Sequence, residues 1–307
     1  MGSHNPIVSI GLPVFNGEKY LAEAIDSFLV QSFGDFELII SDNASTDHTE
    51  EVCRKYVAAD SRIHYFRNKV NVGAAHNHNL VFELSRGCYF KWAGHDDLYA
   101  PDYLARCVSV LDSEPAVALC YPKTILIDET GHETGRYEED DLDLSFPHPH
   151  QRLRSLLHHP MHMLLSPSLG LTRSKSLAKT GGYGNYFAAD RVVLEELALQ
   201  GPFRRIPEYL FYRRLHAENS TQANQSDEAI AIWMDPTLNK KAPAPRWRRF
   251  IGNLHGIRHA SIGAGDRFLC YKEFCSFYLN PRRFDGMRRD VIQILALKYP
   301  AKRLRHW

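Results

Sequence analysis

Short apolar runs alternate along the first hundred residues with longer segments whose apolar residues recur every three or four positions. The runs predict β-strands at residues 7–13, 36–42, 63–67 and 89–93. The longer segments predict helices at residues 18–32, from an N-cap at Ser45-Thr46-Asp47 to residue 59, and at residues 74–84. This alternation indicates an α/β fold, in which a mostly parallel central sheet carries helices on both faces.

The middle of the chain continues the pattern less regularly. We expect helices at 101–113 and 190–199, strands at 116–121, 124–127, 203–207 and 209–214, and a mobile loop at 138–150. The loop prediction rests on an acidic stretch followed by His and Pro residues. Beyond residue 240, apolar residues at helical spacing among arginines predict an α-helical C-terminal appendage.

The composition is that of an ordinary globular protein, and 307 residues suffice for one large domain or for a domain with a smaller appendage. The six cysteines are scattered and form no CxxC pair, so neither a zinc ribbon nor a disulfide framework is indicated. We recognise no run of about twenty apolar residues and no secretion signal. These features predict a cytoplasmic protein.

The formal net charge of +1 hides an uneven distribution of charge. Residues 240–307 contain sixteen Lys and Arg against four Asp and Glu, so the rest of the chain is acidic. Three interpretations of this basic tail stay open: helices that cover the main domain, a surface that rests on the anionic inner face of a membrane, or a site for an anionic polymer. No nucleic-acid module is recognisable, so nucleic acid is not an expected partner.

Polar residues collect where the first four predicted strands end. These positions are Pro13 to Asn16, Asp42, Asn71 with Gly73, and Asp96 with Asp97. In an open parallel sheet, ligands bind in the crevice beyond the carboxyl ends of the strands. We therefore expect these side chains to surround one site.

The residue types alone allow three roles for the adjacent carboxylates of Asp96 and Asp97. They can ligate a hard divalent cation, divide the roles of acid and base, or cap the helix that begins at Pro101. The other polar strand ends favour one of the first two uses.

Four ordered segments resemble the family 2 glycosyltransferases, which have the GT-A fold. They are PVFNGEKYLAEAIDSFLVQSF, ELIISDNASTDHT, NVGAAHNHN and GCYFKWAGHDD, and they fall within residues 6–130. A looser resemblance covers residues 168–221, where AADRVVLEELALQG and FYRRLHAENS are similar to the acceptor side of such enzymes. The resemblance implies a GT-A domain at 6–225, with a nucleotide-sugar-binding half at 6–130 and an acceptor half at 131–225, before a basic helical region at 226–307.

The resemblance also implies the substrates: a nucleotide-diphosphate sugar, with a UDP-sugar favoured, and a hydroxyl acceptor that is a carbohydrate, a lipid-linked glycan or a small molecule. The residues that would hold the donor are Pro13, Val14, Phe15, Asn16, Asp42, Asn71, Gly73, His78, Asn79 and Asp96. Asp42 would accept a hydrogen bond from a ring N–H of the base. Many family members carry Arg at the position of His78, and a histidine is not reliably charged at neutral pH.

A divalent cation, Mn²⁺ or Mg²⁺, is implied at Asp96 and Asp97, where it would bridge the two phosphates of the donor. Many members carry a further Asp at the position of Gly94, so we expect His216 to complete the metal ligands. Asp190 matches the base that takes the proton of the acceptor hydroxyl while the anomeric carbon is inverted. Its alternative role is that of a helix N-cap.

Two competing functions stay open at this point. A nucleotidyltransferase would also build an α/β sheet around a metal and a nucleotide, although the Gly-rich loop that cradles a triphosphate is missing after the first strand. A sugar-nucleotide-binding protein without catalysis would explain why Gly94 replaces an acid.

Overall fold

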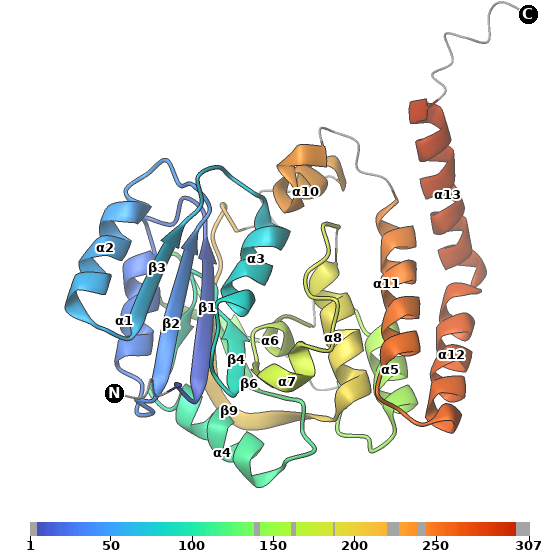
Figure 1. Cartoon of the computed structure of the whole chain (residues 1–307), viewed down its shortest axis with the longest axis horizontal. Helices are drawn as coiled ribbons and strands as arrows, with labels where there is room; N and C mark the ends of the chain where they lie inside the picture. The colour runs from blue at the N-terminus through green and yellow to red at the C-terminus, as the bar shows by residue number, and fades with distance from the viewer. Residues whose placement is uncertain are drawn as a thin grey trace, which may run out of the picture.

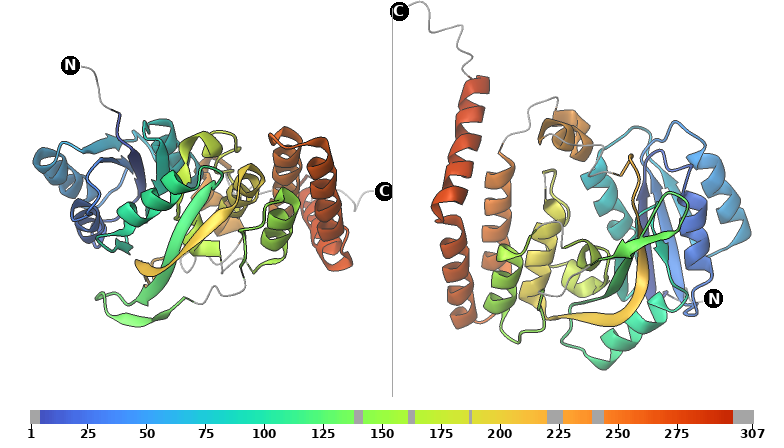
Figure 2. Two further views of the ribbon diagram at one scale, coloured as in Figure 1. Left: turned by 90° about the horizontal axis from the view of Figure 1, so that it is seen from below. Right: turned by 180° about the vertical axis from the view of Figure 1, so that it is seen from behind.

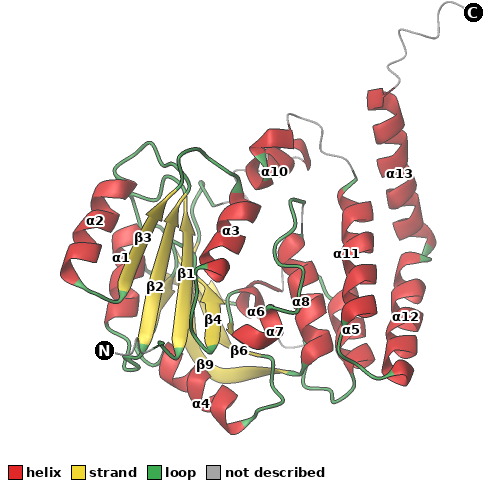
Figure 3. Cartoon of the chain, viewed as in Figure 1, coloured by secondary structure: helices red, strands yellow, loops and turns green. Residues whose placement is uncertain are grey.

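The structure is a computed structural model that describes residues 5–137, 142–160, 164–186, 188–219, 227–238 and 244–298. Within these ranges, nine strands form one sheet with helices packed on both of its faces (Figure 1). Colouring by secondary structure shows the sheet and the helices around it (Figure 3). The α/β fold predicted from the sequence is confirmed.

The first half of the sheet is parallel and brings the predicted polar strand ends to one edge. Its order is β3 (Ile63–Arg67), β2 (Phe36–Asp42), β1 (Val8–Val14) and β4 (Tyr89–Trp92). The register pairs Val14 with Asp42, so the last residues of β1 and β2 lie side by side. All seven residues of β2 are buried, which explains its nearly continuous apolar run.

The second half of the sheet differs from the prediction. β6 (Leu119–Ile127) and β9 (Phe203–Arg214) are each one continuous strand where two short strands were predicted. The breaks in the pattern coincide with a β-bulge, because the register of the pair shifts on either side of Lys123. Proline cannot donate to the ladder, so Pro122 and Pro207 fit at such an irregularity without ending the strands.

Three short strands complete the sheet, and the sequence pattern did not predict two of them. β8 (Leu171–Arg173) lies antiparallel between β4 and β6, β5 (Leu98–Tyr99) pairs with β9, and β7 (Glu133–Arg136) pairs with β6. Segments of two to four residues carry too little periodicity to be recognised. The sequence shows a short ordered run at 168–172, which overlaps β8, and no signal for β5 or β7.

Helices on the two faces bury separate apolar clusters. One face is covered by α1 (Leu21–Leu29), α2 (Thr49–Ala59) and α4 (Tyr103–Ser113). The other is covered by α3 (Ala74–Glu83), α6 (Leu165–Ser168), α7 (Ser174–Leu177) and α8 (Ala189–Gln200). Gly11 allows α3 to pack directly on β1, since a Cβ at this position would lie 2.6 Å from Cγ2 of Val81.

The basic C-terminal region packs against the second half of the chain. α11 (Pro245–His259), α12 (Ala264–Tyr278) and α13 (Pro281–Lys298) form the side of the molecule opposite α2 (Figures 1 and 2). They share a buried cluster with α5 (Pro149–His158), and α11 also packs on α8. The predicted helical appendage is therefore present.

The predicted loop at 138–150 is wrong in part. Residues 138–141 lie outside the described residues, but Leu142 and Leu144 are buried in the core beside α8, and α5 begins at Pro149. The acidic and His-Pro composition concealed two core leucines. Among the described helices, none is long and apolar enough to cross a membrane.

We predict that Phe274 and Phe268, both on α12, respond very differently to replacement by alanine. Phe274 is 3% exposed inside the C-terminal cluster, and Phe268 is 70% exposed. Phe274→Ala should lower the free energy of unfolding by about 3–5 kcal/mol, because it leaves a cavity, and Phe268→Ala by less than about 0.5 kcal/mol. Urea denaturation of both variants measures the difference, and equal small effects would show that α12 does not pack on the domain.

Candidate functional site

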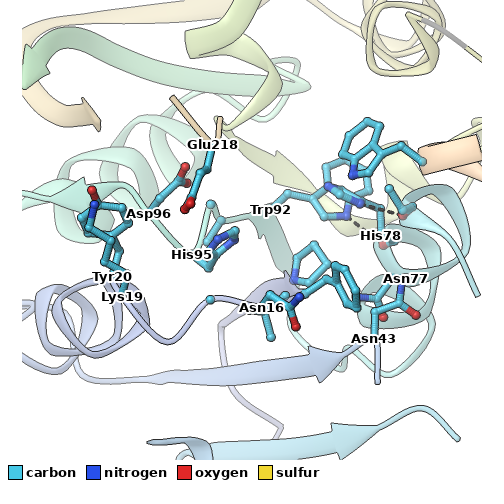
Figure 4. Close-up of a pocket in the computed structure, with 18 of the residues that line it drawn as sticks. Asn16, Lys19, Tyr20, Asn43, Asn77, His78, Trp92, His95, Asp96 and Glu218 are labelled. Atoms are coloured by element: carbon cyan, nitrogen blue, oxygen red, sulfur yellow. Dashed lines mark hydrogen bonds between the residues drawn. The ribbon is translucent and has the colours of Figure 1, made fainter. Parts of the chain in front are cut away.

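A cavity of about 440 Å³ lies beyond the carboxyl ends of β1 and β4. Its wall combines residues from distant parts of the chain: the loop after β1, the start of α3, the loop after β4, and three late segments. Figure 4 shows Asn16, Asn43, His78, His95, Asp96 and Glu218 around this space. The cavity is therefore where the topology of a parallel sheet predicts a ligand.

The structure brings most of the predicted site residues to this wall. Those that line the cavity are Pro13, Val14, Phe15, Asn16, Asn71, His78, Asp96 and His216. Five predicted residues lie outside the lining: Asp42, Gly73, Asn79, Asp97 and Asp190. Four of these five adjoin a residue of the wall in the sequence, and Asp190 lies one residue further away, behind Tyr183, whose ring packs on two lining residues.

Asp96 presents a carboxylate that is already held by two side chains. Its Oδ2 accepts hydrogen bonds from Nε2 of His216 at 2.8 Å and from Nδ2 of Asn219 at 2.9 Å. Burial alone would raise the pKa of Asp96, but the neighbouring His95 and His216 lower it below its usual value. Asp96 is therefore the ionised member of the acidic pair.

Asp97 lies behind Asp96 and is buried. Its Oδ1 accepts a hydrogen bond from the backbone N–H of Arg214 at 3.0 Å. Burial, and then the charge of Asp96, raise the pKa of Asp97 well above its usual value. The two neighbouring acids are tolerated because they carry about one negative charge between them when no cation is bound.

A buried lysine completes the electrostatics of this corner. Nζ of Lys91 lies 3.7 Å from the ring centroid of Tyr99 and has no hydrogen-bond partner among the described residues. Burial lowers the pKa of Lys91 well below its usual value, while Asp97 opposes that shift. The Lys91 ammonium and the Asp97 carboxylate thus each favour the charged form of the other.

Gly94 gives the acidic pair its space. A Cβ at this position would lie 2.6 Å from Oδ2 of Asp97 and 2.9 Å from Oδ1 of Asp96. A third carboxylate at position 94 would therefore collide with the other two in this conformation. The two oxygens that approach Gly94 are also the ones not used by His216, Asn219 or Arg214.

The acidic pair suits a divalent cation that brings its other ligands with it. In the part of the chain that the structure describes, no group of three or more His, Cys, Asp or Glu gathers closely enough to hold a metal ion alone. Two carboxylates near a cavity fit an ion such as Mg²⁺, which commonly takes only one or two protein carboxylates and completes its shell with water and phosphate oxygens. The donor set fits a cation that arrives with a phosphate ligand.

The end of β2 is organised by Asp42, which is fully buried. Its carboxylate accepts from the Ser45 backbone N–H, the Tyr65 hydroxyl and the Arg67 guanidinium at 2.7–2.9 Å. The adjacent Asn43 does line the cavity and donates from Nδ2 to Oδ1 of Asn71 at 2.8 Å. Asp42 thus fixes the turn from which the amide of Asn43 reaches the cavity wall.

His78 is a neutral member of the wall. Its Nδ1 lies 2.8 Å from the carbonyl oxygen of Ala74, so Nδ1 carries the proton and Nε2 is free to accept. Burial lowers the pKa of His78 to about 4. The imidazole therefore offers a hydrogen-bond acceptor at neutral pH rather than a positive charge.

Asn79 ties α3 to the glycine-rich loop at 181–186. Its side-chain amide donates to the carbonyl of Tyr183 at 2.9 Å and accepts from the N–H of Tyr183 at 2.8 Å. The Tyr183 ring packs at 4.8 Å from Trp92 and 4.7 Å from His78, both of which line the cavity. The loop is thus fixed against the cavity wall.

Asp190 lies in the first turn of α8, just after Ala188, whose φ is +67°. Burial raises the pKa of Asp190, and its charge acts on the neighbouring Tyr183. The Tyr183 ring connects Asp190 to the wall of the cavity. A raised pKa makes this carboxylate a stronger base than an exposed aspartate.

Several residues of the site were not predicted from the sequence. They are Lys19, Tyr20, Asn43, Asn77, His95, Glu218, Asn219 and Trp233. Most of them adjoin predicted positions, and Glu218 and Asn219 lie in the quoted segment FYRRLHAENS. Trp233 had no signal in the sequence, because nothing in the pattern indicates that α10 (Asp227–Met234) reaches this cavity.

The sequence matches the family described as Glycosyl transferase family 2 over residues 9–181, which is more than half of the chain. The chain therefore belongs to glycosyl transferase family 2, and it is a glycosyltransferase. An uncharacterized glycosyltransferase of Rickettsia typhi is 30% identical over 249 residues, which cover 75% of this chain and 71% of that protein. Chondroitin synthase of Escherichia coli is 27% identical over 70% of this chain, which spans 30% of that protein.

Solved structures of glycosyltransferases share the fold. TarS of S. aureus in complex with UDP-GlcNAc has a TM-score of 0.64 at 16% identity and covers 91% of this chain and 74% of its own. The mannosyltransferase PcManGT of Pyrobaculum calidifontis, in complex with GDP-Man and Mn²⁺, has a TM-score of 0.52 at 17% identity and covers 96% and 87%. The predicted GT-A architecture is confirmed.

We predict a pH-dependent contribution of Glu196 to stability. Its Oε2 accepts from the N–H of Gly181 at 2.6 Å, and burial raises the pKa of Glu196 from 4.5 to about 7. The folded protein therefore binds this proton more tightly than the unfolded chain. The free energy of unfolding should decrease as the pH rises from about 4.5 to about 7. Glu196→Gln should remove this loss and gain about 1–3 kcal/mol relative to the wild type between pH 5 and pH 8.

Urea denaturation at pH 5 and pH 8 measures this effect. Glu83→Gln, which changes an exposed glutamate on α3, is the control and should leave the pH dependence unchanged. The prediction would be contradicted if the free energy of unfolding changed equally with pH in the wild type and in the Glu196→Gln variant.

Proposed function

We propose that this glycosyltransferase is inverting and metal-dependent, and that it moves a sugar from a nucleotide-diphosphate sugar, with a UDP-sugar favoured, to a hydroxyl of a carbohydrate or lipid-linked glycan. The observation that carries the proposal is the acidic corner of the cavity. There the ionised Asp96, held by His216 and Asn219, adjoins Asp97 and the space left by Gly94. UDP-GlcNAc in TarS and GDP-Man with Mn²⁺ in PcManGT support this choice of donor class and cofactor.

The residues at the carboxyl ends of β1 and β2 are suited to hold the nucleotide. Phe15 is 42% exposed beside the cavity and offers a ring face to a base. The amides of Asn16, Asn43 and Asn71 offer donors and acceptors to the base and ribose. Asp42, Gly73 and Asn79 would support this wall from behind, because their contacts are with its backbone and neighbouring side chains.

Asp96 and Asp97 would hold Mn²⁺ or Mg²⁺, and His216 would orient the Asp96 carboxylate, to which its Nε2 already donates. When bound, such a cation supplies neutralisation of the charge that develops on the leaving diphosphate. In this chain, Asn219 and the N–H of Arg214 orient the two carboxylates. The lack of a side chain at Gly94 leaves space beside the remaining oxygen of each carboxylate. A cation would also lower the pKa of Asp97 and ionise it.

Asp190 would act as the base. As the acceptor oxygen bonds to the anomeric carbon, its proton passes to the Asp190 carboxylate, and the bond from that carbon to the diphosphate oxygen breaks. The bond forms on the face opposite the leaving group, so the configuration inverts. Because Tyr183 lies between Asp190 and the cavity wall, the acceptor would approach along the glycine-rich loop.

The basic C-terminal helices support a further prediction, that the protein works at the inner face of a membrane with a lipid-linked acceptor. α12 and α13 pack on the domain, yet they leave Phe268, Leu279 and Phe284 more than half exposed among basic residues. Apolar side chains within a positive surface suit an anionic bilayer. Sedimentation with vesicles that contain phosphatidylglycerol checks this, and equal recovery with neutral vesicles would contradict it.

The central experiment is turnover of a panel of nucleotide sugars with Mn²⁺. We predict release of nucleoside diphosphate from one of them, and a loss of at least about 100-fold in Asp96→Asn and Asp97→Asn, because the cation that neutralises the leaving diphosphate loses a carboxylate ligand. Asp102→Asn is the matched control, since Asp102 is an exposed acid of the same segment. Asp190→Asn should lower kcat by about 10²–10⁴-fold and leave the Kd of the donor unchanged.

Three results would overturn the proposal. Release of pyrophosphate from a nucleoside triphosphate would indicate a nucleotidyltransferase. Donor binding by calorimetry, combined with activity that Asp190→Asn does not change, would remove Asp190 from catalysis. The absence of donor binding and of turnover across the panel would remove the nucleotide-sugar function itself.

A further inference from the structure

Trp233 lines the cavity, but it has no role in the cation binding proposed for Asp96 and Asp97. It belongs to α10, far beyond the residues 9–181 that match the family. Its side chain lines the cavity and is nevertheless 38% exposed, next to the buried Met234. A large indole that is partly exposed to solvent at the wall of a cavity offers an apolar surface on which a ligand can pack.

The backbone of α10 approaches α3 very closely, which fixes the place of Trp233. A Cβ at Gly73 would lie 2.4 Å from the carbonyl oxygen of Met234 and 2.8 Å from Cδ of Pro236. Gly73 has a φ of +87°, so both its conformation and its lack of a side chain are required here. α10 lies beyond the end of α3 and between α3 and α11 in Figure 1.

The other side of α10 is bound to the glycine-rich loop of the acceptor half. Asp235, which follows α10, accepts from Nδ2 of Asn185 at 2.9 Å. Thr237 holds the same carboxylate with its N–H and its hydroxyl. Arg248 of α11 then donates to Oδ1 of Asn185 at 2.6 Å.

α10 therefore bridges the two halves of the domain at the cavity. A small apolar cluster joins Met234 to Ala75 of α3 and Ala189 of α8, with Tyr183 and Tyr186 packed against it. Ala189 directly precedes Asp190. The backbone that carries Trp233 is thus fixed by the contacts of Met234 and Asp235, which also hold the loop leading to the proposed base.

We propose that Trp233 is a carbohydrate-binding residue, and that its indole stacks on the face of the acceptor sugar ring next to the hydroxyl that is glycosylated. The proposal rests on the proposed function, because it uses the same cavity. The flat C–H face of a pyranose matches an exposed aromatic ring, and Trp92 and His78 line the same cavity, with the Tyr183 ring packed against both of them. Phe15, from the loop after β1, remains for the base of the donor.

The test compares Trp233→Ala with Trp233→Phe and with Ile232→Ala, the neighbouring residue that has the same 38% exposure and is not among the residues lining the cavity. The probes are UDP and a panel of pyranose trisaccharides that includes chitotriose and cellotriose, titrated by calorimetry in the presence of UDP and Mn²⁺. We expect Trp233→Ala to weaken binding of a trisaccharide by at least about tenfold, and Trp233→Phe and Ile232→Ala to change it by less than about threefold. The Kd of UDP should be unchanged in all three variants.

Three results would overturn this proposal. If Trp233→Ala weakens UDP and the trisaccharide equally, the indole contacts the donor instead. If no trisaccharide binds to the wild type, or if Ile232→Ala has the same effect as Trp233→Ala, the indole is not a sugar platform. All three results are distinguishable from failure of the proposed function, in which UDP and the sugar nucleotides would not bind at all.

Discussion

The structure depends on a buried pair of carboxylates that cannot both be charged without a partner. His95 and His216 lower the pKa of Asp96 and favour its charged form, while burial and the charge of Asp96 raise the pKa of Asp97. Burying two adjacent charges in a medium of low polarity costs far more than burying one, so the pair is most stable with one negative charge. A divalent cation changes this balance, because it stabilises the second charge as well.

The rest of the fold holds this pair in place and surrounds it with a ligand cavity. The parallel register of β1, β2 and β4 sets the loops after these strands at one edge of the sheet. The last residues of β9 return to the same edge, where the Arg214 N–H meets Asp97 and the following His216 meets Asp96. Residues more than a hundred positions apart are thereby joined in one corner, and α10 adds Trp233 to the cavity wall.

Much of this arrangement could be predicted from the sequence, because the strand ends carry their chemistry in contiguous segments. The first four strands and Asp96, Asn71 and Asn16 were apparent from periodicity and local composition. The protonation of Asp97, the hydrogen bond from Asn219 and the exclusion of a side chain at Gly94 depend on contacts between distant segments, which no local pattern encodes. Trp233 could not be predicted for the same reason, since its role depends on how closely α10 packs on Gly73.

The most direct test of the acidic corner is electron paramagnetic resonance of Mn²⁺ titrated into the protein with and without UDP. Free Mn²⁺ gives a six-line signal that is lost when the ion is bound. We expect one equivalent of Mn²⁺ to lose this signal when UDP is present, and Asp96→Asn to restore it, because the carboxylates and the diphosphate complete the same coordination shell. A six-line signal that persists with saturating UDP would contradict the role assigned to Asp96 and Asp97.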